Sequence, residues 1–122
     1  MQGLHLLAEW YGCAATLAAM RSADDLQAVC EQLTRQVGLS VVGAYFHQFV
    51  PQGATGTLVL AESHIAIHTW PESGMVTLDI FVCNYSGDNS RRAEQLYASL
   101  KSLFEPEHEQ LHRLQRGAKD VA

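Results

Sequence analysis

Reactive side chains gather in two neighbouring segments of the chain, residues 64–70 and 75–83. Alternate positions of the first segment supply two imidazoles and an aromatic ring: His64, His68 and Trp70. Alternate positions of the second supply a carboxylate, an aromatic ring and a thiol: Asp79, Phe81 and Cys83. Imidazole, carboxylate and thiol groups transfer protons in active sites. Ser63, immediately before the first segment, adds a hydroxyl that a neighbouring base can turn into a nucleophile. The two segments therefore predict a reactive surface.

The alternation within these segments predicts two β-strands, each with two different faces. Successive side chains of a strand point to opposite sides, and the intervening positions are all aliphatic: Ile65, Ile67, Val76, Leu78, Ile80 and Val82. We expect this aliphatic face to pack beneath helices. The reactive face carries no Lys or Arg in these segments, which indicates a dimer interface or a ligand site. The two interpretations are compatible, because a site between two sheets uses this face from both subunits.

Ser63 has the wrong parity to share a face with His68 in one unbroken strand. A bend or bulge at Glu62–Ser63 is required if the two side chains act together. A zinc site formed by His64 and His68 is not expected, since four residues of a strand span about 13 Å. We therefore predict no bound metal.

Composition narrows the class of protein. The length of 122 residues and the 48% hydrophobic content fit a single domain over residues 1–122. A net charge of -5, with only 8 Lys and Arg and no strong basic cluster, argues against nucleic-acid binding. No apolar run approaches membrane-spanning length, and the three cysteines form no Cys-x-x-Cys pair. We expect a cytoplasmic protein with neither a nucleic-acid nor a membrane partner.

Capping and periodicity signals place the strands in an α+β fold. Ser22 is a predicted helix N-cap, with Asp24 and Asp25 in the first turn and Gly38 at the end. Ser90 is the predicted N-cap of a second helix. The expected order is strand 4–10, an irregular segment 13–21, helix 22–38, strands 40–49, 57–61, 64–70 and 75–83, helix 90–103 and strand 109–115. We predict a two-layer sandwich: a mainly antiparallel sheet with helices on one face, and two such sheets packing face to face in a dimer.

The run from Ala61 to Asn84 resembles the core of the bacterial and archaeal type of S-adenosylmethionine decarboxylase. The matching positions are Glu62-Ser63-His64, Ile67-His68-Thr69, Pro71-Glu72, Asp79, Phe81 and Cys83. Upstream, the family's first strand and a later loop are matched by His5, Glu9, Phe46-His47, Phe49, Pro51, Gly53 and Gly56. The resemblance covers roughly residues 3–103 and thins after Phe104.

The resemblance implies that the chain is a proenzyme that cleaves itself at Glu62–Ser63. Ser63 would attack the carbonyl of Glu62 and turn the peptide into an ester. Loss of the serine α-proton, a step in which the family implicates His68, would leave dehydroalanine and then a pyruvoyl group. Thr55 falls where the family has a serine that assists processing. The products would be a chain of residues 1–62 and a chain of residues 63–122 with an N-terminal pyruvoyl cofactor derived from Ser63.

The resemblance also implies the reaction of the mature enzyme. The pyruvoyl ketone would form a Schiff base with S-adenosylmethionine and accept the electrons released with carbon dioxide, giving the aminopropyl donor for spermidine biosynthesis. Cys83 resembles the family's proton donor. Phe49 and Trp70, with His68, resemble the residues that stack on adenine, and Glu72 the ribose partner. The family's homodimer builds its site from both subunits.

Two alternatives remain open at the level of sequence. A related pyruvoyl-dependent decarboxylase of a free amino acid, ornithine or arginine, would keep Ser63, His68 and Cys83 but would not need Phe49 and Trp70. A non-catalytic paralogue would stay uncut. Departures from the family pattern at Met75-Val76-Thr77 and Val82-Cys83-Asn84 border the catalytic strand and could reshape the substrate pocket.

Overall fold

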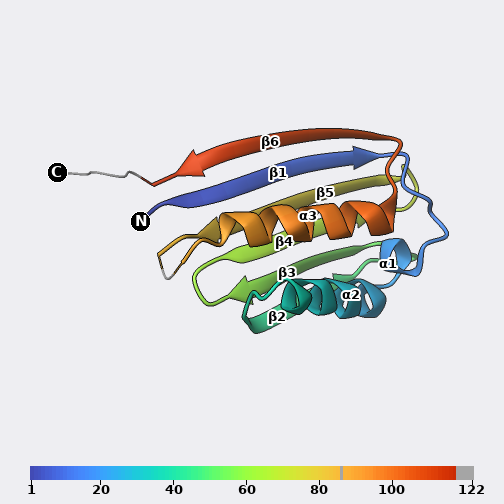
Figure 1. The fold of residues 1–122 in the computed structure, drawn as a ribbon. Coiled ribbons are helices and arrows are strands. Elements are labelled where there is room, and N and C mark those ends of the chain that lie inside the picture. Colours follow the sequence, from blue (N-terminus) through green and yellow to red (C-terminus); the bar gives the residue numbers. More distant parts are fainter. Residues whose placement is uncertain (86, 118–122) are drawn as a thin grey trace.

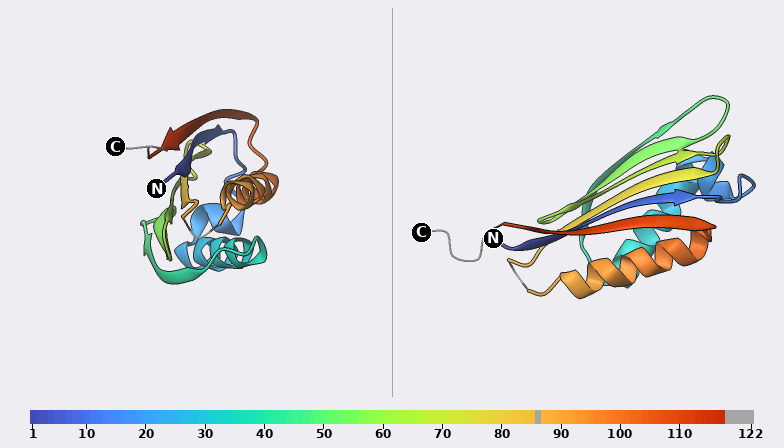
Figure 2. Two further views of the ribbon diagram at one scale, coloured as in Figure 1. Left: turned by 60° about the vertical axis from the view of Figure 1, so that its left-hand side comes forward. Right: turned by 90° about the horizontal axis from the view of Figure 1, so that it is seen from above.

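Six antiparallel strands form one sheet, and the helices lie on one of its faces (Figures 1 and 2). The computed structural model describes residues 1–85 and 87–117. Its elements are β1 (Gly3–Tyr11), α1 (Ala18–Arg21), α2 (Ala23–Gln36), β2 (Val41–Gln48), β3 (Ala54–Leu60), β4 (His64–Trp70), β5 (Met75–Cys83), α3 (Ser90–Phe104) and β6 (His108–Arg116). The strand order is β2-β3-β4-β5-β1-β6. The predicted α+β architecture is confirmed; the face-to-face packing of two sheets stays a prediction.

The alternation predicted for β4 and β5 is present in both strands. Ile65 and Ile67 of β4, with Val76, Leu78, Ile80 and Val82 of β5, are each no more than 2% exposed and belong to the core beneath the helices. Helix α2 adds Leu26 and Cys30, and α3 adds Leu96, Leu100 and Phe104. Within residues 1–85 and 87–117, no helix covers the opposite side of the sheet (Figure 2). We call it the open face.

Local signals fixed α2 but not the start of α3. The side chain of Ser22 accepts a hydrogen bond from the Asp25 N–H, as predicted. The prediction that Ser90 caps α3 is wrong, because Asn89 is the N-cap residue and Ser90 is the first helical residue. The Asn89 side chain makes no cap bond and instead donates to the Cys83 carbonyl at 2.8 Å. This partner lies six residues earlier, at the end of β5, and no helix-capping signal in the sequence points to it.

One further boundary differs from the prediction. Strand β3 begins at Ala54 instead of Thr57. The segment 13–21, predicted as a loop or an irregular helix, contains the short helix α1. Gly56 weakened the strand signal, since glycine is unfavourable in a strand interior. The structure gives the reason for a glycine there: a Cβ atom at Gly56 would overlap the ring of Phe46 on β2.

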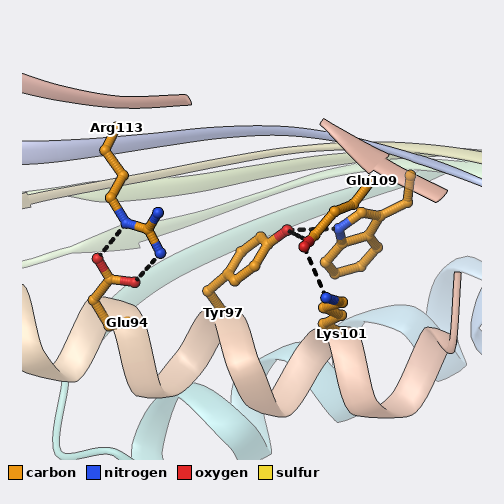
Figure 3. Close-up of polar contacts among 6 residues, drawn as sticks. Glu94, Tyr97, Lys101, Glu109 and Arg113 are labelled. Atoms are coloured by element: carbon orange, nitrogen blue, oxygen red, sulfur yellow. Dashed lines mark hydrogen bonds and ion pairs between the residues drawn. The ribbon is translucent and has the colours of Figure 1, made fainter. Parts of the chain in front are cut away.

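A polar network ties α3 to β1 and β6 (Figure 3). The indole N–H of Trp10 donates to the hydroxyl of Tyr97 at 2.9 Å, and that hydroxyl donates to Glu109. Lys101 pairs with Glu109 at 2.8 Å. Burial, followed by the hydrogen bond to Glu109, raises the pKa of Tyr97 to about 12. Arg113 of β6 forms a second, two-pronged pair with Glu94 of α3.

Removing the hydroxyl of Tyr97 is expected to destabilise the fold measurably. Tyr97→Phe leaves the indole N–H of the fully buried Trp10 without its partner, which predicts a loss of about 1–3 kcal/mol in the free energy of unfolding. Urea unfolding measures the change. Tyr85 is 82% exposed, so Tyr85→Phe is the matched control and is expected to stay within about 0.5 kcal/mol of the original protein. Equal stabilities of the two variants would contradict the role of the network.

Among the described residues, no helix is both long and apolar enough to cross a lipid bilayer.

Candidate active site

The Glu62–Ser63 peptide lies in the turn between β3 and β4. Strand β3 ends at Leu60 and β4 begins at His64, and the Leu60 N–H donates to the Ser63 carbonyl at 3.0 Å. Glu62 is exposed, whereas Ser63 is partly buried. The break in the strand that the sequence required at Glu62–Ser63 is therefore present. A peptide in such a turn is free of the hydrogen-bond ladder that would hold it within a strand.

Ser63 and Cys83 meet at this end of the sheet. The backbone N–H of Cys83, the last residue of β5, donates to the Ser63 hydroxyl oxygen at 3.2 Å. Cys83 is 6% exposed but lies outside the hydrophobic core. The other two thiols are core residues, and burial raises the pKa of Cys13 to about 11 and that of Cys30 to about 12. Cys83 is thus the cysteine whose backbone contacts the serine.

A second group of predicted site residues lies at the other end of β4. The hydroxyl of Thr55 and the Nδ1 atom of His68 are 2.9 Å apart on adjacent strands. The His68 ring stacks on Trp70, with 5.8 Å between centroids and 23° between planes. This contact places Thr55, His68 and Trp70 in one cluster on the open face.

An open cavity of about 440 Å³ continues from this cluster. Its lining residues are Phe49, Val50, Pro51, Gln52, Thr69, Trp70 and Glu72. All three residues assigned to substrate binding, Phe49, Trp70 and Glu72, therefore line the same cavity. Two aromatic rings with a carboxylate beside them are able to bind a flat heteroaromatic group that carries hydroxyls.

One chain does not bring the two clusters together. At about 3.3 Å per strand residue, His68 lies about 16 Å from Ser63, and Trp70 about 23 Å. Both clusters nevertheless lie along β4. A site that needs both of them must draw them from two copies of the chain.

The open face is rich in imidazole. The strand register places all six histidines on it: His5, His47, His64, His68, His108 and His112. His5 lies 3.6 Å from Asp79, and its Nε2 atom is buried. Burial lowers the pKa of His5 more than the nearby Asp79 raises it. The lowered pKa favours the neutral form of the His5 ring. A neutral imidazole is easier to bury than a charged one if a second sheet covers the open face.

Arg116 also borders this region, although the sequence predicted no role for it at the site. Its guanidinium lies 4.6 Å from the ring centroid of Phe81. Gly3 makes room for Phe81, because a Cβ atom there would lie 2.8 Å from the ring. The resemblance thins after Phe104, so it assigned no role to Arg116.

Comparison with known proteins gives consistent matches. The family model described as S-adenosylmethionine decarboxylase matches residues 4–117. The S-adenosylmethionine decarboxylase proenzyme of Archaeoglobus fulgidus is 39% identical over 94% of this chain and 97% of its own length. That of Picrophilus torridus is 34% identical over 96% of this chain and 85% of its own length.

A solved structure matches the fold over nearly its whole length. The crystal structure of adenosylmethionine decarboxylase from Aquifex aeolicus has a TM-score of 0.86 and 32% sequence identity. The match covers 98% of this chain and 94% of that one. Family model, relatives and structure agree over both clusters and the sheet that carries them. The chain therefore belongs to the S-adenosylmethionine decarboxylase family.

Proposed function

We propose that the chain is a self-processing decarboxylase that converts S-adenosylmethionine to its decarboxylated form with a pyruvoyl group made from Ser63. The observation that carries this proposal is the contact of Ser63, in a turn, with Cys83 at the end of β5. It joins the residue assigned to the cofactor and the residue assigned to protonation. Membership of the S-adenosylmethionine decarboxylase family supports the same activity.

The position of Ser63 supports self-cleavage. Its hydroxyl oxygen accepts the Cys83 N–H, so its own proton remains available to a base. The Glu62 carbonyl belongs to the adjacent peptide, which is within reach of the hydroxyl once the turn distorts. A partly buried terminus beside a thiol also fits a pyruvoyl group at position 63. That group supplies a ketone and an electron sink for decarboxylation.

Cys83 is suited to protonating the product carbon. An ordinary thiol is mostly protonated at neutral pH and can therefore act as an acid. With 6% of Cys83 exposed, the thiol is shielded from water, which limits proton transfer from solvent.

A homodimer with its two open faces in contact would unite the clusters. A two-fold axis near Ala66, which lies between Ser63 and His68 on β4, would place Ser63 and Cys83 of one copy opposite the partner's Thr55 and His68. The small side chain of Ala66 allows the sheets to approach closely at the axis. Each dimer would contain two such sites, because the interface is self-complementary.

The cavity at Phe49, Trp70 and Glu72 supports a nucleoside substrate. Trp70 and Phe49 offer faces for adenine, and the exposed Glu72 carboxylate can accept hydrogen bonds from ribose hydroxyls. A free amino acid such as ornithine or arginine would use neither ring. Carbon dioxide release from carboxyl-labelled S-adenosylmethionine, compared with labelled ornithine and arginine, tests the proposal. Release from either amino acid, and none from S-adenosylmethionine, would refute it.

Replacing Glu72 is expected to weaken substrate binding without affecting self-cleavage. Glu72→Gln removes a charged acceptor for the ribose hydroxyls, which predicts a KM for S-adenosylmethionine that is about ten-fold to one-hundred-fold higher. Steady-state kinetics on the cleaved enzyme measures the change. Gln52 lines the same cavity, and Gln52→Ala is the control for general disturbance of the cavity. A KM unchanged in Glu72→Gln would contradict the ribose role.

A further inference from the structure

A small cavity lies beside the Glu62–Ser63 turn, between that turn and the helices. Its volume is about 110 Å³, enough for a group larger than one water molecule. The lining residues come from the chain after α2, from the β3–β4 turn and from the start of α3: Gly38, Leu39, Ser40, Leu60, Ala61, Glu62, Ser63, Asn89 and Arg92. Arg92 is the cation in this lining.

Arg92 has no anionic partner within residues 1–85 and 87–117. Its guanidinium donates to the side-chain oxygen of Asn89 at 3.0 Å, and the Nε and Cζ atoms of the same group lie over Gly38. Arg91 and Arg92 both occupy the first turn of α3, which contains no acidic residue. The helix dipole disfavours cations at that end. Helix stability therefore does not account for a positive charge beside the turn.

Hydrogen bonds connect Arg92 to the serine. Asn89 accepts from Arg92 through its oxygen and donates through its nitrogen to the Cys83 carbonyl at 2.8 Å. The Cys83 N–H in turn donates to the Ser63 hydroxyl. The N-cap side chain of α3 is used for this connection instead of for the helix. The guanidinium and the peptide proposed to break therefore line the same cavity and are linked through Asn89 and the backbone of Cys83.

We propose that Arg92 binds the new C-terminal carboxylate of Glu62, which forms from the backbone carbonyl during self-cleavage. The small cavity is the site of this binding. The inference rests on the proposed cleavage at Glu62–Ser63.

After the shift to the ester, a base removes the α-proton of residue 63, and the C–H electron pair forms the Cα–Cβ double bond. The Cβ–Oγ bond breaks, and its electron pair leaves on the Glu62 carboxylate. Water then hydrolyses the dehydroalanine, releasing ammonia and leaving the pyruvoyl group.

The charge that develops in this elimination falls on the leaving carboxylate. A guanidinium positioned beforehand lowers the barrier, because it meets that charge without reorganising. Ester formation passes through only a transient oxyanion on the Glu62 carbonyl oxygen and ends in a neutral ester, whereas the elimination ends with a full negative charge on the carboxylate. Loss of Arg92 should therefore slow the elimination more than the formation of the ester.

The test follows cleavage in freshly translated full-length chain. Arg92→Met keeps an unbranched side chain of similar length but removes the charge, Arg92→Lys keeps a charge, and Arg91→Met is the matched control in the same helical turn. Arg92→Met is expected to cleave at least about ten-fold more slowly. It should accumulate an ester that hydroxylamine cuts, giving a C-terminal chain that begins with an unmodified serine. Arg92→Lys should recover part of the rate, and Arg91→Met should match the original protein.

The outcomes separate this inference from the proposed function. An original chain that stays uncut would refute self-cleavage itself. An original chain that cleaves, alongside an Arg92→Met variant that cleaves at the same rate, would refute the role of Arg92 alone. Slow cleavage of Arg92→Met with no accumulated ester would also overturn it, since a general structural defect would delay both steps.

Discussion

Replacing Ser63 with alanine is expected to leave the chain as one uncut polypeptide with no decarboxylase activity. The methyl group cannot attack the Glu62 carbonyl, so neither ester nor pyruvoyl group can form. Without that group the reaction has no electron sink, and the loss of activity should be at least about 10⁴-fold. Intact-protein mass and carbon dioxide release from labelled S-adenosylmethionine measure both effects.

The matched control for this change is Ser73→Ala. Ser73 is exposed in the turn between β4 and β5, at the opposite end of β4 from Ser63. The Ser73→Ala variant should cleave itself and decarboxylate S-adenosylmethionine as the original protein does. Cleavage of the Ser63→Ala chain, or activity retained in the uncut chain, would rule out Ser63 as the source of the cofactor.

Mixing two inactive variants is expected to restore activity, because each site draws on two chains. Ser63→Ala lacks the cofactor residue but keeps His68, and His68→Ala keeps Ser63 and Cys83. In a mixed dimer one of the two sites is intact and the other carries both defects. Random assembly of equal amounts makes half the dimers mixed, so about a quarter of the original activity should return. Co-expression, followed by isolation of dimers carrying both of two affinity tags, measures the mixed dimer directly.

A second pair of variants provides the control. Ser63 and Cys83 touch within one chain, so Ser63→Ala and Cys83→Ala damage the same half of the site. In their mixed dimer, each site lacks one of these two residues, and no activity should return. Recovery in both pairs, or in neither, would contradict the assignment of the two clusters to different subunits.

Alternation along β4 and β5 was enough to predict which side chains enter the core and which form the open face. Parity required a break at Glu62–Ser63 only if Ser63 and His68 of one chain act together; the break is present, although the two residues lie about 16 Å apart along the chain. These features depend on neighbouring residues only, and the period of a strand determines them. The cap of α2 at Ser22 is local in the same sense.

Features that depend on distant partners could not be predicted in this way. Asn89, not Ser90, is the N-cap residue of α3, and its side chain binds the Cys83 carbonyl instead of a helix N–H. The small cavity at Arg92 forms only where the segment after α2, the start of α3 and the β3–β4 turn meet. Ser63 and Trp70 are separated by the length of a seven-residue strand. The family motifs assign both residues to one active site, but they do not show that the two residues come from different copies of the chain.

The central claim is that the chain cuts itself and uses the new terminus to decarboxylate S-adenosylmethionine. Intact-protein mass spectrometry of fresh protein, before and after S-adenosylmethionine and cyanoborohydride are added, tests it most directly. We predict one chain ending at Glu62 and a second beginning with a pyruvoyl group at position 63, which gains mass from the trapped substrate. A single uncut chain after prolonged incubation, or cut chains that never trap S-adenosylmethionine, would contradict the claim.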